Sequence, residues 1–312
     1  MKKTINEIES IGILGAGAVG SFYGSKLQNS GIKTEFQSQL LFSEKVKKLS
    51  IKSIWGDFSL PVSVYSDPRG MSKSDLIIIS TKIINIDEDV EKLRNWLKYL
   101  LKPRSVILLL QNGINIEEML QSSFPNHAIL GGLAFTCINR VSPTVIEHID
   151  YGKIKIGSNL KKHHEIAKKV TLLFQNAGID CEYLPSLRMG RYEKLLWNVP
   201  FNSLSVLFKS KTDMLIKEDT TRILAYNLMM DIYKIARKDN IPLNKKLIPE
   251  MIERTIKMKP YKTSMLLDYE ANRKLEIEAI LGEPLRIALN YKLKVPYLES
   301  IYYILKHIQA YS

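Results

Sequence analysis

The sequence predicts an α/β chain in which a domain built on a parallel β-sheet precedes an all-helical domain. Its 312 residues are more than one hydrophobic core usually organises, so two domains are expected. In the first half, short apolar runs alternate with helical segments, a pattern typical of parallel strands covered by helices on both faces. After about residue 160 the pattern changes, and nearly every segment is compatible with a long helix.

The individual strands and helices follow from local patterns. The predicted strands are Ile11–Leu14, Lys33–Gln37, Asp75–Ile79 and Val106–Leu110, with further strands between Gly131 and Ile156. The predicted helices are Ala18–Asn29, Ile86–Leu101, His163–Asn176, Leu187–Leu207, Glu218–Asp239, Asn244–Lys257 and Met265–Tyr291. We place the domain boundary near Pro185, so the predicted domains cover residues 1–184 and 185–312.

The composition argues against a membrane protein and against a secreted one. The longest uncharged apolar runs, Leu76–Ile79 and Val106–Leu110, are far shorter than the ~20 residues that span a bilayer. The N-terminus has two lysines but no apolar stretch behind them, so we expect no secretory signal. We therefore expect a cytoplasmic protein with no membrane partner.

Charge and metal-ligand patterns argue against two further classes of function. The net charge is +13, but the lysines are spread along the chain without an arginine-rich arm or an RNA-binding aromatic motif. We expect solvated helix faces and no nucleic-acid partner, although a positive field would favour small anionic ligands. Cys137 and Cys181 each stand alone and the five histidines lack ligand spacing, so we expect buried thiols and no metal.

The glycine-rich segment near the N-terminus carries the sharpest local signal. Gly15, Gly17 and Gly20 have the GxGxxG spacing, directly after an apolar strand and directly before a helix. The first permits a tight turn, the second lets the backbone approach a pyrophosphate, and the third allows close packing of helix on strand. N–H groups at the helix N-terminus would bind the phosphates. We predict a Rossmann-like dinucleotide-binding turn, with cofactor-binding residues Gly15, Ala16, Gly17, Ala18, Val19 and Gly20.

The choice of dinucleotide depends on the end of the second predicted strand. Proteins that prefer NAD usually carry an acidic residue there, which binds the ribose 2′-hydroxyl. Here Glu35 lies within the strand, and the strand end carries Gln37, Ser38 and Gln39. The strand end has no acidic group, which would repel a 2′-phosphate, and no arginine, which would bind one. This pattern favours NADPH and leaves NADH open.

The most informative pattern of the second half is formed by Lys194, Asn198 and Asn202. On a helix these side chains stack along one face, at i, i+4 and i+8. The residues around them are apolar, and Pro200 removes a backbone donor and should kink the helix beside the stripe. An ammonium and two amides suit a buried site that orients an oxygen-rich anion. A solvated polar face is the alternative.

Three other segments are candidates for the same site. Residues 80–82 and residues 111–113 each follow a predicted buried strand, so both lie at the carboxyl edge of the sheet, where α/β proteins bind ligands. Residues 263–278 are rich in charges, and such a run usually means an exposed helix. The pattern by itself would not single out Ser264 or Glu276 within it.

Together these pieces resemble the ketopantoate reductases (2-dehydropantoate 2-reductases), over nearly the whole chain. The motifs that carry the resemblance are the glycine loop, Thr81-Lys82, Gln111-Asn112-Gly113, Lys194-Leu-Leu-Trp-Asn198-Val-Pro-Phe-Asn202, and Ser264-Met-Leu with Glu276. The resemblance implies a Rossmann-like domain followed by a helical domain similar to the C-terminal domain of 6-phosphogluconate dehydrogenase. It also implies NADPH-dependent reduction of a small oxo acid, ketopantoate, to pantoate for pantothenate and coenzyme A biosynthesis.

The resemblance further implies a role for each site residue. Lys194 would match the catalytic lysine, the general acid that polarises the ketone and supplies a proton as hydride arrives. Glu276 would match the acid that assists this proton transfer and orients the substrate. Lys82 would lie near the adenosine part of the cofactor, where the family uses a lysine to favour NADP. The residues that would hold the substrate and the nicotinamide side of the site are Asn112, Asn198, Asn202 and Ser264.

Two positions depart from the family's pattern. The family commonly has an arginine near the position of Gln39 that pairs with the 2′-phosphate, and Lys45 or Lys47 could replace it here. Residues 211–213 stand where many members carry an asparagine that contacts substrate. Thr212 could donate one hydrogen bond from this position, but it lacks the paired donor and acceptor of an amide.

Two other classes of function stay open at this point. A 2- or 3-hydroxy acid dehydrogenase of the 6-phosphogluconate or 3-hydroxyisobutyrate type also uses a Lys-x-x-x-Asn helix, so Lys194 and Asn198 do not separate it. Asn202, the 112–113 turn and the Ser264–Glu276 pair favour the ketopantoate type. A non-catalytic nicotinamide-binding sensor or a nucleic-acid binder would not need Lys194 and Glu276. The helical domain could support a homodimer.

Overall fold

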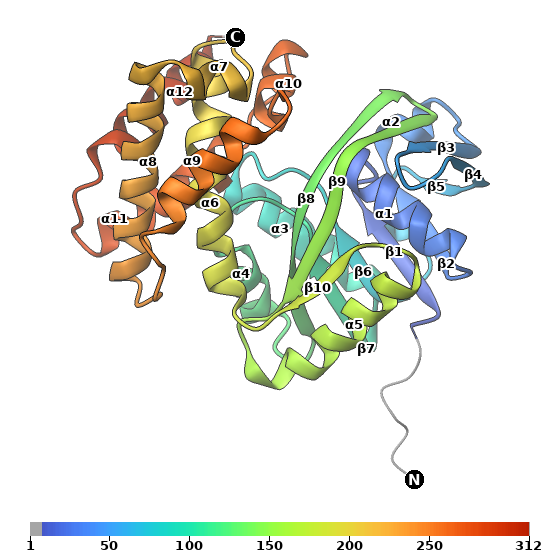
Figure 1. Cartoon of the computed structure of the whole chain (residues 1–312). Helices are drawn as coiled ribbons and strands as arrows, with labels where there is room; N and C mark the ends of the chain where they lie inside the picture. Colours follow the sequence, from blue (N-terminus) through green and yellow to red (C-terminus); the bar gives the residue numbers. More distant parts are fainter. Residues whose placement is uncertain (1–7, 312) are drawn as a thin grey trace. The chain divides into compact units, whose positions relative to one another are not determined.

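The computed structural model describes residues 8–311, and its contacts divide the chain into two compact units (Figure 1). Unit 1 consists of Met1–Lys82, Asp87–Gln111 and Ile116–Leu187, and unit 2 consists of Ile83–Ile86, Asn112–Asn115 and Arg188–Ser312. The predicted boundary between residues 184 and 185 stays a prediction, because contacts do not show which segments fold by themselves. The N-terminal segment in which we expect no secretory signal lies almost entirely outside the described residues.

Unit 1 is built on one mixed β-sheet. Within residues 8–311 the strand order is β4-β3-β9-β8-β7-β6-β1-β2-β5, and β10 pairs with β9. The strands are β1 (Ser10–Leu14), β2 (Lys33–Gln37), β3 (Lys48–Ser53), β4 (Phe58–Pro61), β5 (Ser63–Tyr65), β6 (Ser74–Ile79), β7 (Leu101–Leu109), β8 (Ala128–Ser142), β9 (Val145–Gly157) and β10 (Cys181–Leu184).

The predicted parallel sheet is confirmed from β5 through β2, β1, β6 and β7 to β8. The central strands β6 and β7 end in continuous apolar runs because both of their faces are buried. The strands expected between Gly131 and Ile156 are β8 and β9, but their pairing as a long antiparallel hairpin was not predicted. It extends the sheet beyond the part that the strand–helix alternation explains.

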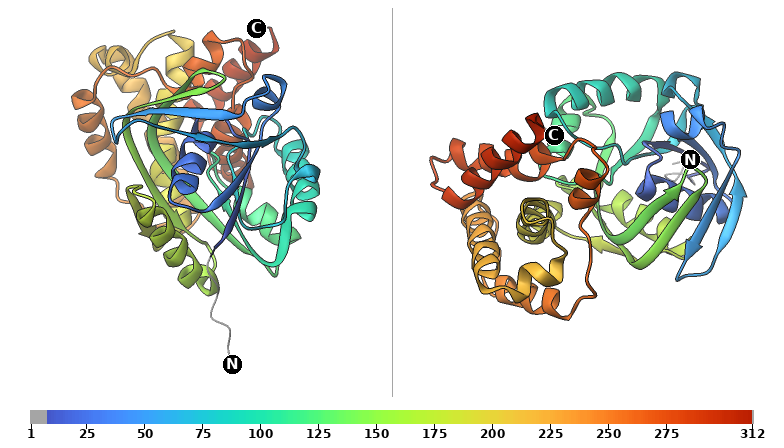
Figure 2. Two further views of the ribbon diagram at one scale, coloured as in Figure 1. Left: turned by 90° about the vertical axis from the view of Figure 1, so that its right-hand side faces the viewer. Right: turned by 90° about the horizontal axis from the view of Figure 1, so that it is seen from above.

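The helices of unit 1 are α1 (Ala18–Asn29), α2 (Gln39–Ser43), α3 (Ile86–Leu100), α4 (Ile116–Ser123) and α5 (His164–Asn176). Helix α1 contacts β1 and β2, and it also contacts β3 and the β8–β9 hairpin, which can be followed in green in Figures 1 and 2. Because strands cover it from more than one side, even Ser21 and Ser25 of α1 are buried. The Tyr23 hydroxyl donates a hydrogen bond to Gly152 O at 3.1 Å, which ties α1 to β9.

Unit 2 is helical and has a hydrophobic core of its own. Its elements are α6 (Leu187–Leu207), α7 (Thr212–Lys217), α8 (Asp219–Lys238), α9 (Leu247–Lys257), α10 (Ser264–Glu270), a π-helical turn η3 (Glu278–Gly282), α11 (Glu283–Asn290) and α12 (Pro296–Ala310). The predicted helices at α6, α8 and α9 are confirmed. Helices α7 and α12 were not among the predicted ones.

A buried carboxylate on α8 caps α12. Asp231 is fully buried and accepts hydrogen bonds from the backbone N–H groups of Tyr297 (3.0 Å) and Leu298 (3.2 Å). These donors lie in the first turn of α12, where N–H groups have no partner within the helix. Lys234, one turn further along α8, forms an ion pair with the same carboxylate at 3.0 Å. Asp231 therefore joins two helices of unit 2 through a carboxylate that is itself out of contact with water.

The single helix predicted over Met265–Tyr291 is wrong. The chain leaves the helix after Glu270, Asn272 adopts a left-handed backbone (φ 50°), and the helix resumes only at η3. Arg273 N donates to Asp268 O at 2.8 Å, and Leu275 N donates to the Gln309 side chain at 2.6 Å. The second of these contacts is made with α12, a helix that lies far along the chain and that the local pattern does not reveal.

Other expectations concern cysteines, membranes and metals. Cys137 and Cys181 are both buried thiols, as predicted. No helix between residues 8 and 311 is both long enough and apolar enough to cross a membrane. In the same range, no group of three or more histidine, cysteine, aspartate or glutamate side chains could hold a metal ion.

Candidate functional site

The turn after β1 has the backbone that its glycines predict. Gly15 has a φ of +84°, and a Cβ at this position would lie 2.6 Å from Thr81 N. A Cβ on Gly20 would collide with Ser80 Oγ, because α1 packs directly on the end of β6. Gly17 is exposed, and the nearest atom to an added Cβ would be 3.9 Å away. The loop is therefore tightly packed on its inner side and open at Gly17.

Gln37, the last residue of β2, fixes the start of this loop. Its Oε1 accepts a hydrogen bond from Gly15 N at 3.2 Å, and its Nε2 donates to Ser66 O at 3.0 Å. Its backbone oxygen accepts from Ala16 N at 2.8 Å. Gln37 stands at the strand end, where a ribose-binding residue is expected, but its buried side chain holds the glycine loop instead.

The segments that follow β6 and β7 meet at the same sheet edge. Ser80 Oγ donates to Gly15 O at 2.7 Å, so the end of β6 touches the glycine loop. The Gln111 side chain, after β7, donates to Thr81 O at 2.8 Å. Lys82 follows directly and is exposed. The predicted position of these segments at the carboxyl edge is confirmed, while the role of Lys82 in cofactor binding stays a prediction.

No charged side chain stands at the end of β2, at residues 37–39, where it could bind the cofactor's ribose or its 2′-phosphate. Glu35 is buried inside β2 and accepts hydrogen bonds from Ser72 N (2.7 Å) and Ser72 Oγ (2.9 Å), which confirms that it lies within the strand. Gln39 is exposed at the first position of α2, and Lys45 and Lys47 are exposed as well. The first turn of α1 contains no acidic residue. An uncapped helix start beside an open glycine fits an anionic pyrophosphate.

In unit 2, the polar stripe of α6 lies inside the protein. Asn198 and Asn202 are 7% and 2% exposed, and Lys194, on the same helix face, is partly buried. The alternative of a solvated polar face is therefore wrong. Asn202 Oδ1 is buried and has no hydrogen-bond partner among residues 8–311, so a ligand hydroxyl or amine would satisfy it. Helix α6 continues through Pro200, and the kink expected there stays a prediction.

The ammonium of Lys194 has an unusual electrostatic environment. Burial lowers the pKa of Lys194 from its ordinary value of 10.5 to about 7, and the nearby positive charge of Arg191 lowers it as well. The carboxylate of Glu276 acts in the opposite direction and raises this pKa. A lysine that exchanges its proton near neutral pH is suited to general acid–base chemistry.

Glu276 lies where the three chain segments of unit 2 (residues 83–86, 112–115 and 188–312) come together. It is 8% exposed, so the exposed helix expected for this charged run is wrong at this residue. Its Oε1 lies 3.5 Å from Ile83 N, and its Oε2 lies 3.4 Å from Asn112 Nδ2. Asn115 holds the second of these segments through hydrogen bonds with Glu283 (2.8 Å) and Arg188 (3.0 Å). Asn112 and Glu276 thus meet although 164 residues separate them.

The remaining predicted substrate residues lie near the end of α6. Ser264 is the exposed first residue of α10. Thr263 before it caps α10, and its Oγ1 is 2.6 Å from Ser205 Oγ of α6. Thr212 is buried, and its hydroxyl already accepts a hydrogen bond from Tyr261 N at 3.3 Å. Its ability to contact a substrate in place of an asparagine stays a prediction.

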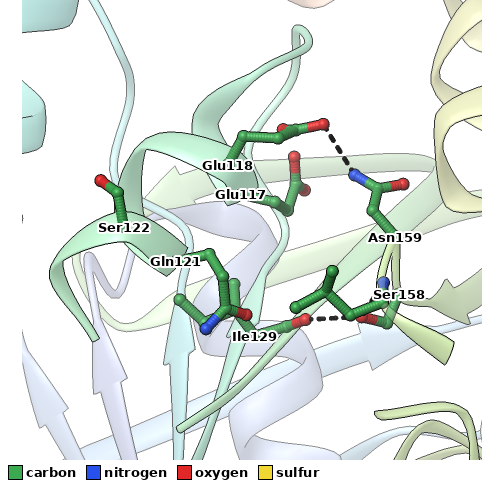
Figure 3. A pocket seen from close by; sticks show the side chains of 8 residues that line it. Glu117, Glu118, Gln121, Ser122, Ile129, Ser158 and Asn159 are labelled. Carbon is green, nitrogen blue, oxygen red and sulfur yellow. Dashed lines mark hydrogen bonds between the residues drawn. The ribbon is translucent and has the colours of Figure 1, made fainter. Parts of the chain in front are cut away.

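A pocket in unit 1 has a different character. It has a volume of about 230 Å³ and lies between α4 and the residues that follow β9 (Figure 3). Glu118 accepts a hydrogen bond from Asn159 at its rim, and Ser158 Oγ donates to Ile129 O at 3.1 Å. None of the predicted site residues lines it. Its two carboxylates, on Glu117 and Glu118, would repel an anionic cofactor.

Sequence reasoning missed two basic residues. Arg191 lies one turn before Lys194 on α6, so its position at i−3 was a usable signal. Arg140, at the end of β8, donates to the carbonyl oxygens of Ala16 and Gly17. The sequence contains no signal for this second contact, because it depends on how the β8–β9 hairpin lies against α1.

Comparisons with known proteins agree with this arrangement. The model of the ketopantoate reductase PanE/ApbA family matches residues 11–161, and that of its C-terminal domain matches residues 186–309. A 2-dehydropantoate 2-reductase of Nostoc sp. is 37% identical over 306 residues, covering 96% of this chain and 94% of that protein. The chain belongs to the ketopantoate reductase family. As a member of this family, the protein is a dinucleotide-dependent oxidoreductase.

Solved structures of ketopantoate reductases have the same two-part fold. The 2-dehydropantoate 2-reductase of Geobacter metallireducens superimposes with a TM-score of 0.89 at 32% identity, covering 96% of this chain and 99% of that one. The enzyme of Methylococcus capsulatus gives a TM-score of 0.83 at 30% identity, covering 96% and 97%. The predicted fold class, an α/β dinucleotide-binding domain followed by a helical domain, is confirmed by these matches.

Two substitutions in this family member are expected to move the pKa of Lys194 in opposite directions. Glu276→Gln removes the charge that raises this pKa, and Arg191→Met removes a charge that lowers it. If the protonated lysine is the active form, kcat/KM falls as pH rises through the pKa. This fall should occur at lower pH in Glu276→Gln and at higher pH in Arg191→Met, as pH profiles of kcat/KM would show.

A nearby carboxylate provides the control for this pair. Glu278 is hydrogen-bonded to Tyr302 and Lys306, and it is not among the groups that shift the pKa of Lys194. Glu278→Gln should therefore leave the profile in place. Shifts in the same direction for Glu276→Gln and Arg191→Met would contradict the assignment of the titrating group to Lys194.

Proposed function

We propose that this chain catalyses the NADPH-dependent reduction of ketopantoate to pantoate, with Lys194 as the general acid, in the biosynthesis of pantothenate and coenzyme A. One observation carries the proposal: a lysine whose pKa lies near 7 shares a helix face with two buried amides and interacts with a buried carboxylate. Family membership supports ketopantoate as the oxo acid.

The proposed chemistry needs a hydride for the carbonyl carbon and a proton for the carbonyl oxygen. A reduced nicotinamide, when bound, would supply the hydride. Lys194 gives its proton to the oxygen, so the ketone becomes a secondary alcohol and the lysine is left neutral. With a pKa near 7, a substantial fraction of Lys194 is protonated at neutral pH and the proton is only weakly held. A proton from solvent restores the acid form of Lys194 for the next turnover, and Glu276 stabilises this protonated form.

The substrate's other polar groups would be held by amides and a hydroxyl. We assign the substrate carboxylate and hydroxyl to Asn112, Asn198, Asn202 and Ser264. The unsatisfied Asn202 Oδ1 supports this assignment, because an acceptor buried without a donor is costly until a ligand hydroxyl occupies the site. Each amide can donate and accept at the same time, which suits a molecule that carries both a carboxylate and a hydroxyl.

Two parts of the cofactor are assigned to unit 1: its pyrophosphate to residues 15–20 and its adenosine part to the neighbourhood of Lys82. Asn112, which belongs to unit 2, is assigned to the nicotinamide side. The absence of an acidic group at residues 37–39 supports NADPH over NADH. Because Gln39 stands where the family commonly has an arginine, we expect the preference for NADPH to be modest.

The test is a turnover assay with purified protein, followed by the loss of NADPH absorbance in the presence of ketopantoate. Turnover with ketopantoate, and slower turnover with NADH, is the expected result. Turnover with another 2-oxo or 3-oxo acid alone would replace the proposal by a related hydroxy acid dehydrogenase. Cofactor binding without any turnover would replace it by a nicotinamide-binding sensor.

The expected cellular setting follows from the same proposal. We propose a cytoplasmic enzyme whose partners are its cofactor and its small oxo acid, without nucleic acid or membrane. A homodimer formed through the helical domain also stays a proposal, and sedimentation analysis of the purified protein would test it.

A further inference from the structure

Arg140 reaches the glycine loop from the end of β8. Its Nη2 donates to Ala16 O at 2.8 Å, to Gly17 O at 3.1 Å and to Ser21 Oγ at 2.6 Å. Its Nη1 donates to Pro143 O at 2.6 Å. The planar guanidinium fork places Nη1 on Pro143 and Nη2 on the loop at the same time, whereas the single ammonium of lysine cannot reach both places.

These contacts determine where the peptide groups of the loop point. In a trans peptide the C=O and the N–H point in opposite directions, so the group that holds the carbonyl also orients the amide. Because Arg140 and Ser21 N both bind Gly17 O, the N–H of Ala18 is directed to the opposite side of that peptide. N–H groups in the first turn of a helix have no partner within the helix and are those that bind anions.

Arg140 also brings a positive charge that unit 1 does not neutralise. Its four contacts are neutral oxygens, and no carboxylate within residues 8–311 forms an ion pair with it. Burial among these groups lowers the pKa of Arg140 to about 10, because the charged form is poorly solvated there. With no acidic residue in the first turn of α1, the nearest compensation would come from a bound anion.

We propose that Arg140 is a positioning residue of the cofactor's pyrophosphate site: it orients the peptide groups of the glycine loop and places a positive charge beside the first turn of α1. The inference rests on the proposed dinucleotide-binding function and goes beyond it by adding a residue from a distant strand. Since the pyrophosphate is common to NADPH and NADH, Arg140 supports both cofactors equally and does not discriminate between them.

The test compares the dissociation constants of NADPH and NADH, measured by nicotinamide fluorescence at several salt concentrations. Arg140→Gln keeps a hydrogen-bonding side chain but removes the charge. We expect it to raise the dissociation constants of NADPH and NADH by the same factor, about tenfold. Its dissociation constants should also depend less on salt than those of the wild type, because one screened charge has been removed. Inorganic pyrophosphate should compete with NADH less well in the variant.

Two further variants separate this role from general effects. Arg104 is exposed on β7, so Arg104→Gln changes the net charge equally and should leave both dissociation constants unchanged. Arg140→Lys keeps the positive charge but lacks the two-pronged guanidinium. Its dissociation constants for both cofactors should be higher than those of the wild type, with the same dependence on salt. This variant also tests the inference if Arg140→Gln does not fold.

The possible results either support or overturn the inference. Wild-type dissociation constants in both Arg140 variants would overturn it. Loss of NADPH binding alone would also overturn it, because the arginine would then contact the 2′-phosphate. Failure of the wild type to bind either cofactor would overturn the inference together with the proposed function. Normal cofactor binding by the wild type without reduction of ketopantoate would remove only the proposed function.

Discussion

Replacing Lys194 by alanine is expected to lower the turnover number by a factor of about 100 to 10,000, the usual contribution of a general acid. The reason is that the side chain with a pKa near 7 would no longer deliver a proton to the ketone oxygen. Cofactor binding should be essentially unchanged, because the proposed pyrophosphate site belongs to unit 1 and Lys194 belongs to unit 2. Steady-state kinetics with ketopantoate and NADPH titration by fluorescence would measure both quantities.

Two further variants make this result specific. Lys194→Met keeps most of the apolar volume of the side chain and should lose as much activity as the alanine variant. Lys194→Arg keeps the positive charge, but a guanidinium holds its proton too tightly to act as an acid near neutral pH, so it should also be slow. Turnover close to that of the wild type in Lys194→Met would remove Lys194 from the proposed mechanism.

The second large effect concerns stability. Asp231→Ala should lower the free energy of unfolding by about 3 kcal/mol, because two buried N–H groups at the start of α12 lose their acceptor. The ion pair with Lys234 would be lost at the same time, although its partner is partly exposed and contributes less. Urea denaturation followed by circular dichroism would measure the change.

Two substitutions provide the comparison for Asp231→Ala. Asp231→Asn keeps an acceptor oxygen for the same N–H groups and should cost about 1 kcal/mol. Asp219 is exposed at the start of the same helix, and Asp219→Ala should change the stability by about 0.5 kcal/mol or less. Equal losses in Asp231→Ala and Asp231→Asn would show that the charge, rather than the cap, stabilises this junction.

Features that depend on one continuous segment could be predicted from the sequence. The glycine loop is an example, because the strand, the turn and the helix around it are neighbours in the chain. The stripe on α6 is another, because residues spaced by four share a helix face. The same reasoning failed over residues 265–291. The residues near Asn272 do not forbid a helix, and after the break Leu275 N donates a hydrogen bond to Gln309 of α12, a partner that lies far along the chain.

The chemistry of the candidate site depended more strongly on tertiary structure. The sequence placed Glu276 in an apparently exposed charged run, and only the packing of the segments around Ile83 and Asn112 buries it. The low pKa of Lys194 has the same origin, because burial is its largest cause. Arg140 could not have been found in advance, since 124 residues separate it from the loop carbonyl that it contacts.

The sequence by itself therefore determined the two-part fold class, the strand–turn–helix of the glycine loop and the helix face that carries Lys194, because the loop and the helix face each follow from spacing within one continuous segment. Tertiary structure alone decided which side chains are buried and which charges act on one another. It brought Glu276 to Lys194 and Arg140 to the glycine loop. The physical reason is that pKa values and peptide orientation depend on solvent exclusion and on contacts across the fold, which local periodicity does not encode.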